Sequence, residues 1–473
     1  MRGASLALVL ALVPGCRQIF GLDPPTGTIV DAAQPDALPP ADDGYRSGTR
    51  LKLMWNDYGT TREYTGIYDS VLATQCQAQP WSDGNSYCTP TTVSNVAYLD
   101  ATCTMPVAMV RVISGNCQPP PARFADERNF ACSVSTIQRL FSVGDALPAQ
   151  PFYEVSQGAC TGPFTNVNYV LHTLSGEILP SDVVQQTTMA LPGARLVQQV
   201  LAGADGSEVR STVHDTMLDV DCTPNTADGV CSPANDAGVF VDPSCTMSMA
   251  AGQVGCPSPL YGVQPKHPSC TIADDHYYSV AAASLNADFY QLQYTGVCTS
   301  FARTEGYNYF ALGAEVSTVP VTRRLGSGTG PIVRSYFNDG TSDVGPIALF
   351  DTVHNTLCST VGGQCLPTGN GVLSGTQFYS DAACTMPTDY GTLEVGIPGC
   401  AVPPTPEYAV KADQPAGACT ATYSVETSGA TTSTIYSMGT TCVASTISNG
   451  LYVAMTGEVP LSEFATATSG IDP

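Results

Sequence analysis

Eighteen of the nineteen cysteines fall into three sets of six, and this spacing constrains the fold more than any other feature of the sequence. The third cysteine of every set stands in the same pattern, aromatic-x-Asp-x-x-Cys-Thr-Met. Such a pattern does not recur three times by chance, so it predicts three internal repeats of about 140 residues each. The sets are Cys76, Cys88, Cys103, Cys117, Cys132 and Cys160; Cys222, Cys231, Cys245, Cys256, Cys270 and Cys298; and Cys358, Cys365, Cys384, Cys400, Cys419 and Cys442.

The segments between the cysteines have the composition of strands and turns. Charged residues make up only 12% of the chain, while glycine (44) and proline (36) are abundant, which suits turns better than long solvated helices. Each repeat opens with a hairpin signal, an aspartate with a glycine one or two residues later. In the first repeat, residues 51–55 are expected to pair with a strand that ends near Tyr68. The hairpin signals are Asp57-Tyr58-Gly59, Asp205-Gly206-Ser207 and Asp339-Gly340-Thr341.

The fold is therefore predicted to be all-β, and the repeats suggest two ways of assembling it. Each repeat holds roughly eight short strands and divides into two halves, so six halves favour a six-bladed β-propeller, whose radial arrangement protects strand edges. The alternative is three tandem disulfide-rich β domains. Short linkers between the repeats favour the propeller. The predicted repeats are residues 49–190, 191–322 and 323–473.

The first residues resemble an export signal. Residues 4–12 form an apolar run of nine residues after Arg2, which is too short to span a bilayer as a helix. The segment Leu12-Val13-Pro14-Gly15-Cys16 resembles the bacterial lipobox, which implies that residues 1–15 are removed and that Cys16 carries the lipid. The alternative is an ordinary signal peptide in which Cys16 is incidental. Residues 16–48 are rich in Asp, Ala and Pro and are predicted to be a disordered tether.

The signal, the tether and the repeats together resemble the uncharacterised cysteine-rich repeat lipoproteins of Gram-negative bacteria. The resemblance implies a palmitate-bearing lipoprotein held in the cell envelope. Arg17, in place of an aspartate after the lipidated cysteine, favours the outer membrane or the cell surface. No activity is implied by the resemblance.

The cysteines are predicted to form disulfides. Metal knuckles need thiols two to four residues apart, and the closest pair here is Cys358 and Cys365, so no metal site is predicted. Six cysteines allow 15 pairings per repeat, and proximity along the sequence favours sequential pairing. The predicted disulfides are Cys76–Cys88, Cys103–Cys117, Cys132–Cys160, Cys222–Cys231, Cys245–Cys256, Cys270–Cys298, Cys358–Cys365, Cys384–Cys400 and Cys419–Cys442.

No catalytic motif stands out in the sequence. It lacks His-Glu-x-x-His, Gly-x-Ser-x-Gly and a phosphate-binding glycine loop, so no cofactor is predicted. His214-Asp215 and Asp351-x-x-His354 suggest a hydrolase triad, but the repeats share only the aspartate and the hydroxyl residue after it. Aspartates in this setting bind their own backbone, so six of them are predicted to be turn residues. They are Asp69, Asp215, Asp351, Asp100, Asp242 and Asp381.

The charge balance excludes nucleic acid as a partner. The formal net charge is −23 and there are only three lysines, whereas phosphate recognition needs clustered basic residues. The expected function is that of a lipid-anchored cell-envelope binding or scaffold protein, not an enzyme, with a carbohydrate or an envelope protein as its ligand. One alternative is an extracytoplasmic polysaccharide hydrolase or lyase that uses paired carboxylates. Another is a purely structural envelope protein.

Overall fold

The protein is all-β in the computed structural model. Among the described residues there is no α-helix, and the helical elements are two short 3-10 turns, η1 (Pro180–Asp182) and η2 (Leu461–Glu463). No helix in this part of the chain is long and apolar enough to cross a membrane. The predicted signal, Cys16 and the tether as far as residue 43 lie outside the described residues. The structure describes residues 44–91, 93–111, 122–132, 134–156, 158–165, 168–225, 229–233, 239–265, 275–285, 288–292, 298–303, 306–368, 378–393, 407–413, 421–438, 441–446 and 451–473.

Three four-stranded antiparallel meanders share one strand order and one register. Their first strands begin opposite a buried aspartate: Leu51 pairs with Asp69, Leu196 with Asp215, and Ile332 with Asp351. The strands are β1 (Leu51–Asp57), β2 (Arg62–Asp69), β3 (Thr74–Pro80) and β4 (Ser86–Pro90); β13 (Leu196–Gly203), β14 (Glu208–Asp215), β15 (Val220–Asn225) and β16 (Val230–Ser232); and β25 (Ile332–Asn338), β26 (Asp343–Asp351), β27 (Thr356–Val361) and β28 (Gln364–Pro367).

Local sequence explains the first hairpin of each meander. In β1 the buried side chains of Leu51, Leu53 and Trp55 alternate with partly exposed ones, as expected for a strand with one face in the core. Lys52 pairs with Tyr68, as predicted. The turn that joins β1 to β2 contains Gly59, whose φ of 84° is costly for residues with a Cβ atom. The equivalent glycines of the other two hairpins also have positive φ.

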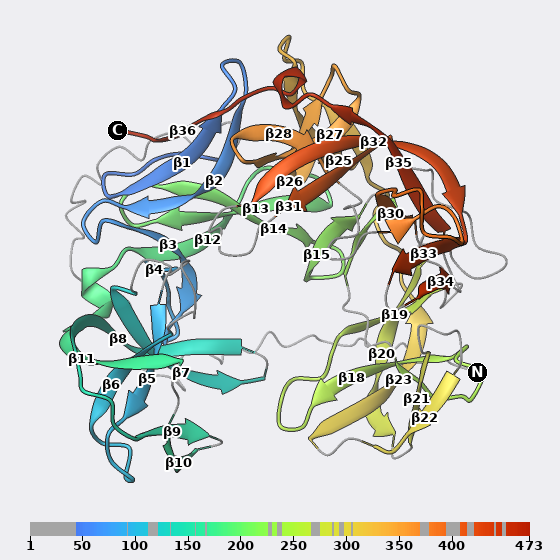
Figure 1. Cartoon of the computed structure of the whole chain (residues 1–473). Coiled ribbons are helices and arrows are strands. Elements are labelled where there is room, and N and C mark those ends of the chain that lie inside the picture. The colour runs from blue at the N-terminus through green and yellow to red at the C-terminus, as the bar shows by residue number, and fades with distance from the viewer. Residues whose placement is uncertain are drawn as a thin grey trace, which may run out of the picture. The chain divides into compact units, whose positions relative to one another are not determined.

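Three further strands, which we call the straps, each follow one meander and pair with the next. The β12 strap pairs with both β4 and β13, and the β24 strap pairs with β25. The β36 strap pairs with β1, so the last strand of the chain returns to the first (Figure 1). The straps are β12 (Gln185–Ala190), β24 (Thr322–Leu325) and β36 (Thr468–Ile471).

The chain just before each strap contacts the last strand of the preceding meander in the same way. Three hairpin cysteines donate a backbone hydrogen bond to a carbonyl in these segments, at 2.9, 3.0 and 2.9 Å. Each segment therefore connects two successive meanders through main-chain bonds. The donor and acceptor pairs are Cys88 and Val184, Cys231 and Val319, and Cys365 and Ala465.

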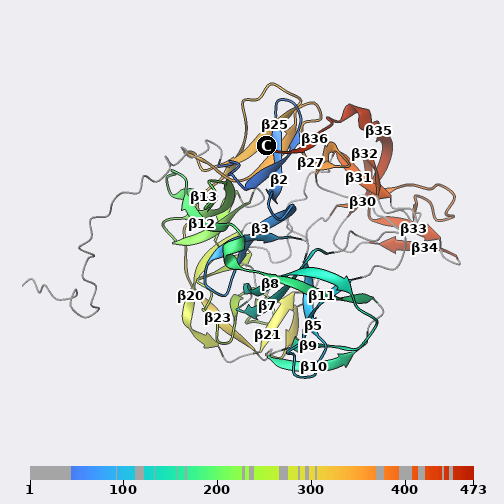
Figure 2. The same ribbon diagram turned by 90° about the vertical axis from the view of Figure 1, so that its left-hand side faces the viewer.

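The other half of each predicted repeat forms a different kind of sheet, in which one strand order recurs. The orders β7-β8-β11-β6, β19-β20-β23-β18 and β31-β32-β35-β30 correspond, and so do β10-β9-β5, β22-β21-β17 and β34-β33-β29. Figure 2 shows β8 beside β11 in the first of these sheets. The strands β5 and β7 pair in parallel, and the other pairings between these strands are antiparallel.

The bounds of these strands are as follows. They are β5 (Val93–Tyr98), β6 (Pro106–Arg111), β7 (Phe124–Ala131), β8 (Val134–Ala146), β9 (Phe152–Ser156), β10 (Ala159–Phe164) and β11 (Tyr169–Ile178); β17 (Val239–Phe240), β18 (Ser248–Gln253), β19 (Tyr261–Pro265), β20 (Asp275–Leu285), β21 (Phe289–Leu292), β22 (Cys298–Phe301) and β23 (Tyr307–Glu315); and β29 (Phe378–Tyr379), β30 (Tyr390–Leu393), β31 (Tyr408–Asp413), β32 (Thr422–Thr432), β33 (Thr434–Met438), β34 (Cys442–Thr446) and β35 (Leu451–Val459).

Three predicted disulfides are present, and each lies in the core of a meander. Cys76 and Cys88 pack with Leu51 and Leu53, and the second and third meanders contain equivalent clusters. Each bond joins neighbouring strands of one hairpin, so proximity along the sequence was a sound guide. The three bonds are Cys76–Cys88, Cys222–Cys231 and Cys358–Cys365.

The other six predicted disulfides are wrong, because at least one cysteine of each is bonded elsewhere. The structure pairs Cys103 with Cys160, Cys245 with Cys298 and Cys384 with Cys442, and it pairs Cys132 with Cys256. These bonds replace Cys103–Cys117, Cys132–Cys160, Cys245–Cys256, Cys270–Cys298, Cys384–Cys400 and Cys419–Cys442. Cys117, Cys270, Cys400 and Cys419 lie outside the described residues.

A long-range strand contact explains the first three corrections. The hairpin of β9 and β10 returns to β5, where Tyr153 pairs with Tyr98, and this brings Cys160 to the turn that contains Cys103. Phe240 pairs with Tyr290 in the same way, and the third contact of this kind joins β29 to β33. Proximity along the sequence cannot predict such long-range contacts, because 57 positions separate Cys103 from Cys160.

The strap pairings bear on the predicted repeat boundaries. The first boundary, between residues 190 and 191, follows β12, although five residues of that strand pair with β13 of the next repeat. The second boundary, between residues 322 and 323, falls inside β24. The β12 and β36 straps therefore belong to one predicted repeat by sequence and to another by hydrogen bonding, whereas the predicted boundary divides β24.

Candidate functional site

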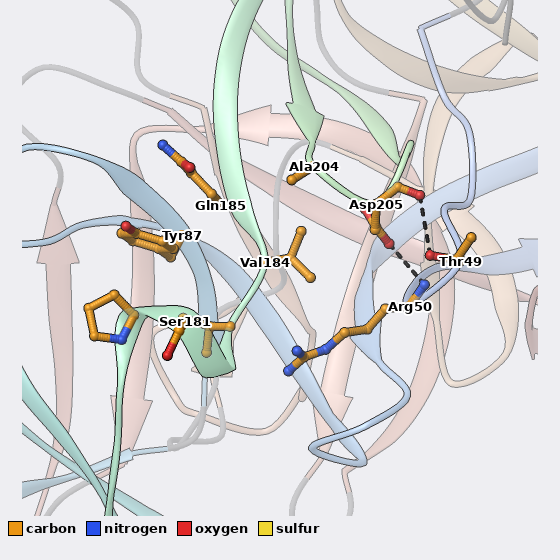
Figure 3. A pocket seen from close by; sticks show the side chains of 10 residues that line it. Thr49, Arg50, Tyr87, Ser181, Val184, Gln185, Ala204 and Asp205 are labelled. Atoms are coloured by element: carbon orange, nitrogen blue, oxygen red, sulfur yellow. Dashed lines mark hydrogen bonds between the residues drawn. The ribbon is translucent and has the colours of Figure 1, made fainter. Parts of the chain in front are cut away.

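A hollow of about 650 Å³ lies where the chain passes from η1 into the β12 strap (Figure 3). Its polar lining comes from four places: the residues before β1, the strand β4, η1 with the start of β12, and the hairpin that joins β13 to β14. The residues with polar side chains are Thr49, Arg50, Tyr87, Ser181, Gln185 and Asp205.

Asp205 supplies a carboxylate to the hollow, but both of its oxygens already accept hydrogen bonds. Oδ2 accepts the backbone N–H groups of Arg50 at 2.9 Å and Leu51 at 2.6 Å. Oδ1 accepts the N–H and the hydroxyl of Ser207 at 3.2 and 2.8 Å. This carboxylate therefore ties the start of β1 to the hairpin between β13 and β14.

The other ionisable groups of the hollow are also engaged. The guanidinium of Arg50 donates to both oxygens of Asp69 at 2.8 and 2.7 Å, and to the carbonyl of Asp182 at 2.7 Å. The Tyr87 hydroxyl donates to Asp83 at 2.7 Å, and this bond raises the pKa of Tyr87 and lowers the pKa of Asp83. The ionisable side chains of the lining are therefore all hydrogen-bonded within the protein.

The predicted turn residues Asp69, Asp215 and Asp351 end β2, β14 and β26, and each is at most 2% exposed. In all three, Oδ1 accepts the N–H groups of the residues two and three positions later, at 2.8 to 3.2 Å. These hydrogen bonds replace the hydrogen bonds to water that a carboxylate loses when it is buried. The three side chains hold the turns that follow their strands.

Two of these buried carboxylates are paired with arginine. Arg195 binds Asp215 as Arg50 binds Asp69, through Nε and a terminal nitrogen at 2.8 and 2.7 Å. The Arg195 guanidinium also donates to the carbonyl of Ser317 at 2.6 Å, just as Arg50 donates to Asp182. One guanidinium thereby connects the turn, the first strand of the meander and the chain that leads to a strap.

The third carboxylate is paired with histidine. Pro331 occupies the place of Arg50, and Nδ1 of the buried His354 lies 2.8 Å from Asp351. The imidazole stacks on Phe464, which directly follows η2, with ring centroids 4.4 Å apart. In the third meander, ring stacking of His354 on Phe464 therefore connects the turn to the segment before the strap. The other triad candidate does not form, because His214 contacts Asp221 at 3.0 Å instead of Asp215.

Sequence reasoning missed the two arginines. Each stands directly before an apolar strand, twenty residues or fewer from its aspartate, so an alignment of the repeats could have identified the first two pairs. The third repeat obscures the signal, since its proline stands where the arginine would be. In the third repeat, a histidine three residues after Asp351 takes the place of the arginine. This exchange could not be recognised without the fold.

The other predicted turn residues lie at the third cysteine of each set. Oδ1 of Asp100 accepts the N–H groups of Thr104 and Met105 at 2.9 and 2.7 Å, and the other two turns repeat these bonds. The cysteine inside each turn has a positive φ of 51 to 53° and is bonded to the sixth cysteine of its set. These turns are therefore braced by a carboxylate and a disulfide together.

Hydrogen bonds keep the carboxyl groups of these turns ionised. For Asp242, burial pushes the pKa upward, but bonds from Ser244, Met247 and Thr246 outweigh it and hold the pKa at about 2. The hydroxyl of Thr102 is the main cause of the lowered pKa of Asp100. The pKa of Asp381 is lowered in the same direction by backbone and hydroxyl donors.

The predicted aspartates are thus separated into individual turns, and the structure does not bring them together at one site. Among the described residues, no group of three or more His, Cys, Asp and Glu side chains is placed to hold a metal ion. Comparison with known proteins gives no curated relative and no solved structure that matches the chain. The model of a family of unknown function, DUF7481, matches residues 32–403, which is more than half of the sequence, and the chain belongs to that family.

Proposed function

We propose that this protein is a lipid-anchored, extracytoplasmic binding or scaffold module whose stiffness serves the display of a binding surface. The observation that carries the proposal is the density of cross-connection: seven disulfides among the described residues, and straps that pair across successive meanders. Disulfides persist in oxidising compartments, so these bonds support a location of the folded body outside the cytoplasm.

The membrane anchor of the proposal rests on the amino-terminal sequence. Cys16 would carry the lipid after removal of residues 1–15, and residues 17–48 would serve as the tether, with the outer membrane or cell surface as the destination. Metabolic labelling with an alkyne palmitate tests the anchor. We expect label in the full chain and none in Cys16→Ser, and an unlabelled full chain would contradict the anchor.

For the architecture, the proposal is a closed order of three equivalent units, as in a six-bladed propeller, in preference to three tandem domains. The pairing of β36 with β1 supports it, because independent domains in a row would leave the first and last units apart. Asp472, next to β36, adds to this support. Its carboxylate accepts hydrogen bonds from Ser47, Trp55 and Arg62 at 2.8, 3.1 and 2.8 Å.

The ligand of the proposal is a neutral carbohydrate or another envelope protein. The hollow beside η1 is the candidate contact, because its charged groups are engaged and Ser181 remains as an exposed hydroxyl on its rim. Nucleic acid is not an expected partner, given the net charge of −23.

Glycan-array binding and envelope pull-down with the mature full chain test the function. We expect a ligand whose binding falls at least tenfold in Ser181→Trp, which fills the hollow, and is unchanged in Ser462→Trp. Ser462 is the matched control, because it occupies the same place in η2 as Ser181 does in η1. Silence of the unmodified protein in both assays, or equal loss in both variants, would contradict the proposal.

A further inference from the structure

The edges of the first and third β sheets outside the meanders are closed in different ways. In the first sheet, β5 and β7 pair in parallel, so that β5-β6-β11-β8-β7 forms a closed ring of strands. In the third sheet, β30 and β31 are the edges of the order β30-β35-β32-β31, and no strand pairing joins them among the described residues. Side chains connect these two edges, because Asp389 directly precedes β30 and Lys411 lies on β31.

Lys411 and Asp389 are in direct contact between the two edges. The nitrogen Nζ of Lys411 lies 2.6 Å from Oδ2 of Asp389, although the residues are 22 positions apart along the chain. Both side chains are partly shielded from water, with exposed fractions of 26% for Lys411 and 42% for Asp389. The hydrogen bond to Asp389 raises the pKa of Lys411, so the amine needs a neighbouring proton acceptor before it can act as a nucleophile.

Glu426 on β32 is that neighbouring proton acceptor. Its side chain is hydrogen-bonded to the carboxyl group of Asp389, and two carboxyl groups bond in this way only when one of them holds a proton. Burial is the largest cause that raises the pKa of Glu426, and the charge of Asp389 raises it further. Glu458, which pairs with Glu426 in register on β35, acts in the same direction. Glu426 therefore binds a proton more readily than an isolated glutamate does.

We infer that Lys411 and Asp389 form an intramolecular amide bond, an isopeptide bond, with Glu426 as the group that accepts the proton. The three side chains supply what a condensation needs: a nitrogen nucleophile, a carboxyl carbon and a proton acceptor. Groups held in contact within one molecule react as if they were present at very high concentration. The inference goes beyond the proposed function and does not depend on its ligand or its anchor.

The reaction is a condensation that releases one water molecule. It starts from a protonated Asp389, an ionised Glu426 and the ammonium group of Lys411. Nζ attacks Cγ of Asp389, where a C–N bond forms and a C–O bond breaks. The ammonium group loses two protons, one to Glu426 and one to the departing hydroxyl, which leaves as water. No atom is oxidised or reduced, so the step needs no electron acceptor.

The amide bond would close the third sheet covalently, whereas strand pairing closes the first. An ion pair between partly exposed side chains is weakened by salt and contributes little to stability, but an amide bond is insensitive to salt. Reducing agents do not cleave an amide either. The two edges β30 and β31 would therefore stay joined under conditions that open disulfides and screen charges.

Mass spectrometry of the reduced, purified full chain tests the inference. Digestion at glutamate separates the two residues, because Glu394 and Glu407 lie between them along the sequence. We expect the peptide that contains Lys411 to remain joined to the peptide that contains Asp389. The mass of the joined species should be lower than the sum of the two free peptides by one water molecule. Two separate peptides of unchanged mass would show an ion pair only and would overturn the inference.

Two variants of the full chain identify the groups involved. Lys411→Arg keeps the positive charge but removes the amine, so the joined species should be absent. Glu426→Gln keeps the size of the side chain but cannot accept the proton, and we expect the joined fraction to fall about tenfold. A joined species in Lys411→Arg would overturn the assignment of the bond to Lys411. A joined fraction in Glu426→Gln equal to that of the unmodified protein would overturn the role of Glu426.

Discussion

The two families of aspartate turns use the same kind of hydrogen bond at different depths of burial, two and three positions after Asp69 and four and five positions after Asp100. Asp69 at the end of β2 is fully buried and its charge is balanced by Arg50, whereas Asp100 at the β5–β6 turn is partly exposed and lies beside the Cys103–Cys160 disulfide. In both, a carboxylate accepts backbone N–H groups of the turn. The comparison teaches that the fully buried Asp69 has a cation as its partner, whereas the turn of the partly exposed Asp100 is braced by a disulfide.

The largest effect is expected from opening the disulfide of the exposed turn. The double variant Cys103→Ala/Cys160→Ala releases a constraint across 57 residues, which is worth about 4 kcal/mol of unfolding free energy by loop entropy. Urea unfolding of the full chain measures it. As a control, Asp100→Ala, which leaves the disulfide intact, should shift the midpoint far less. An equal shift in the two variants would break the comparison.

The next effect concerns the buried turn. Asp69→Ala leaves the partly buried guanidinium of Arg50 without its carboxylate, and breaking such a pair costs about 3 kcal/mol or more. Native-state hydrogen exchange at Val71 and Leu72 measures the loss, because their N–H groups donate to Asp69. Asp83→Ala, in an exposed turn, is the control and should leave that exchange unchanged. Unaltered protection at Val71 in Asp69→Ala would show that the Asp69 carboxylate is not what holds the turn.

A smaller effect is expected where histidine replaces arginine. His354→Leu removes the partner of the buried Asp351 and should cost about 2 kcal/mol, the value of a hydrogen bond to a charged group. Leucine is chosen because the first and second units carry Leu72 and Leu218 at this position. Adding Pro331→Arg should restore most of the loss in thermal unfolding, because it supplies the cation of the other two units. Failure of this rescue would mean that the three turns are not equivalent.

The smallest effect is a pH dependence of the exposed turns. The pKa of Asp242 is lowered to about 2 in the folded protein, so its hydrogen bonds contribute stability above its ordinary pKa. That contribution is lost as the pH falls through about 2. Hydrogen exchange at Met247 should therefore stay slow at pH 4 and accelerate near pH 2. Acceleration already at pH 4 would contradict the lowered pKa.

The sequence predicted the turns that depend on neighbouring residues, but it did not predict the long-range contacts. The hairpin that contains Gly59 and the turn at Asp69 depend on neighbouring residues, so residue types alone predicted them. The bond between Cys132 and Cys256 depends on where two distant segments come to lie, and no local pattern encodes that. The hollow beside Ser181 escaped prediction for the same reason, since its lining joins residues as far as 156 positions apart along the chain.

The β36 strap brings the end of the chain back to β1, and Asp472 offers the most direct test of this contact. Its carboxylate binds Arg62 and the indole nitrogen of Trp55, and it lies one residue beyond the strap that pairs with β1. Hydrogen exchange of the full chain should be faster across residues 51–57 in Asp472→Ala, with residues 196–203 of the second meander unchanged. Identical exchange across residues 51–57 in the two proteins would contradict the closed order of units.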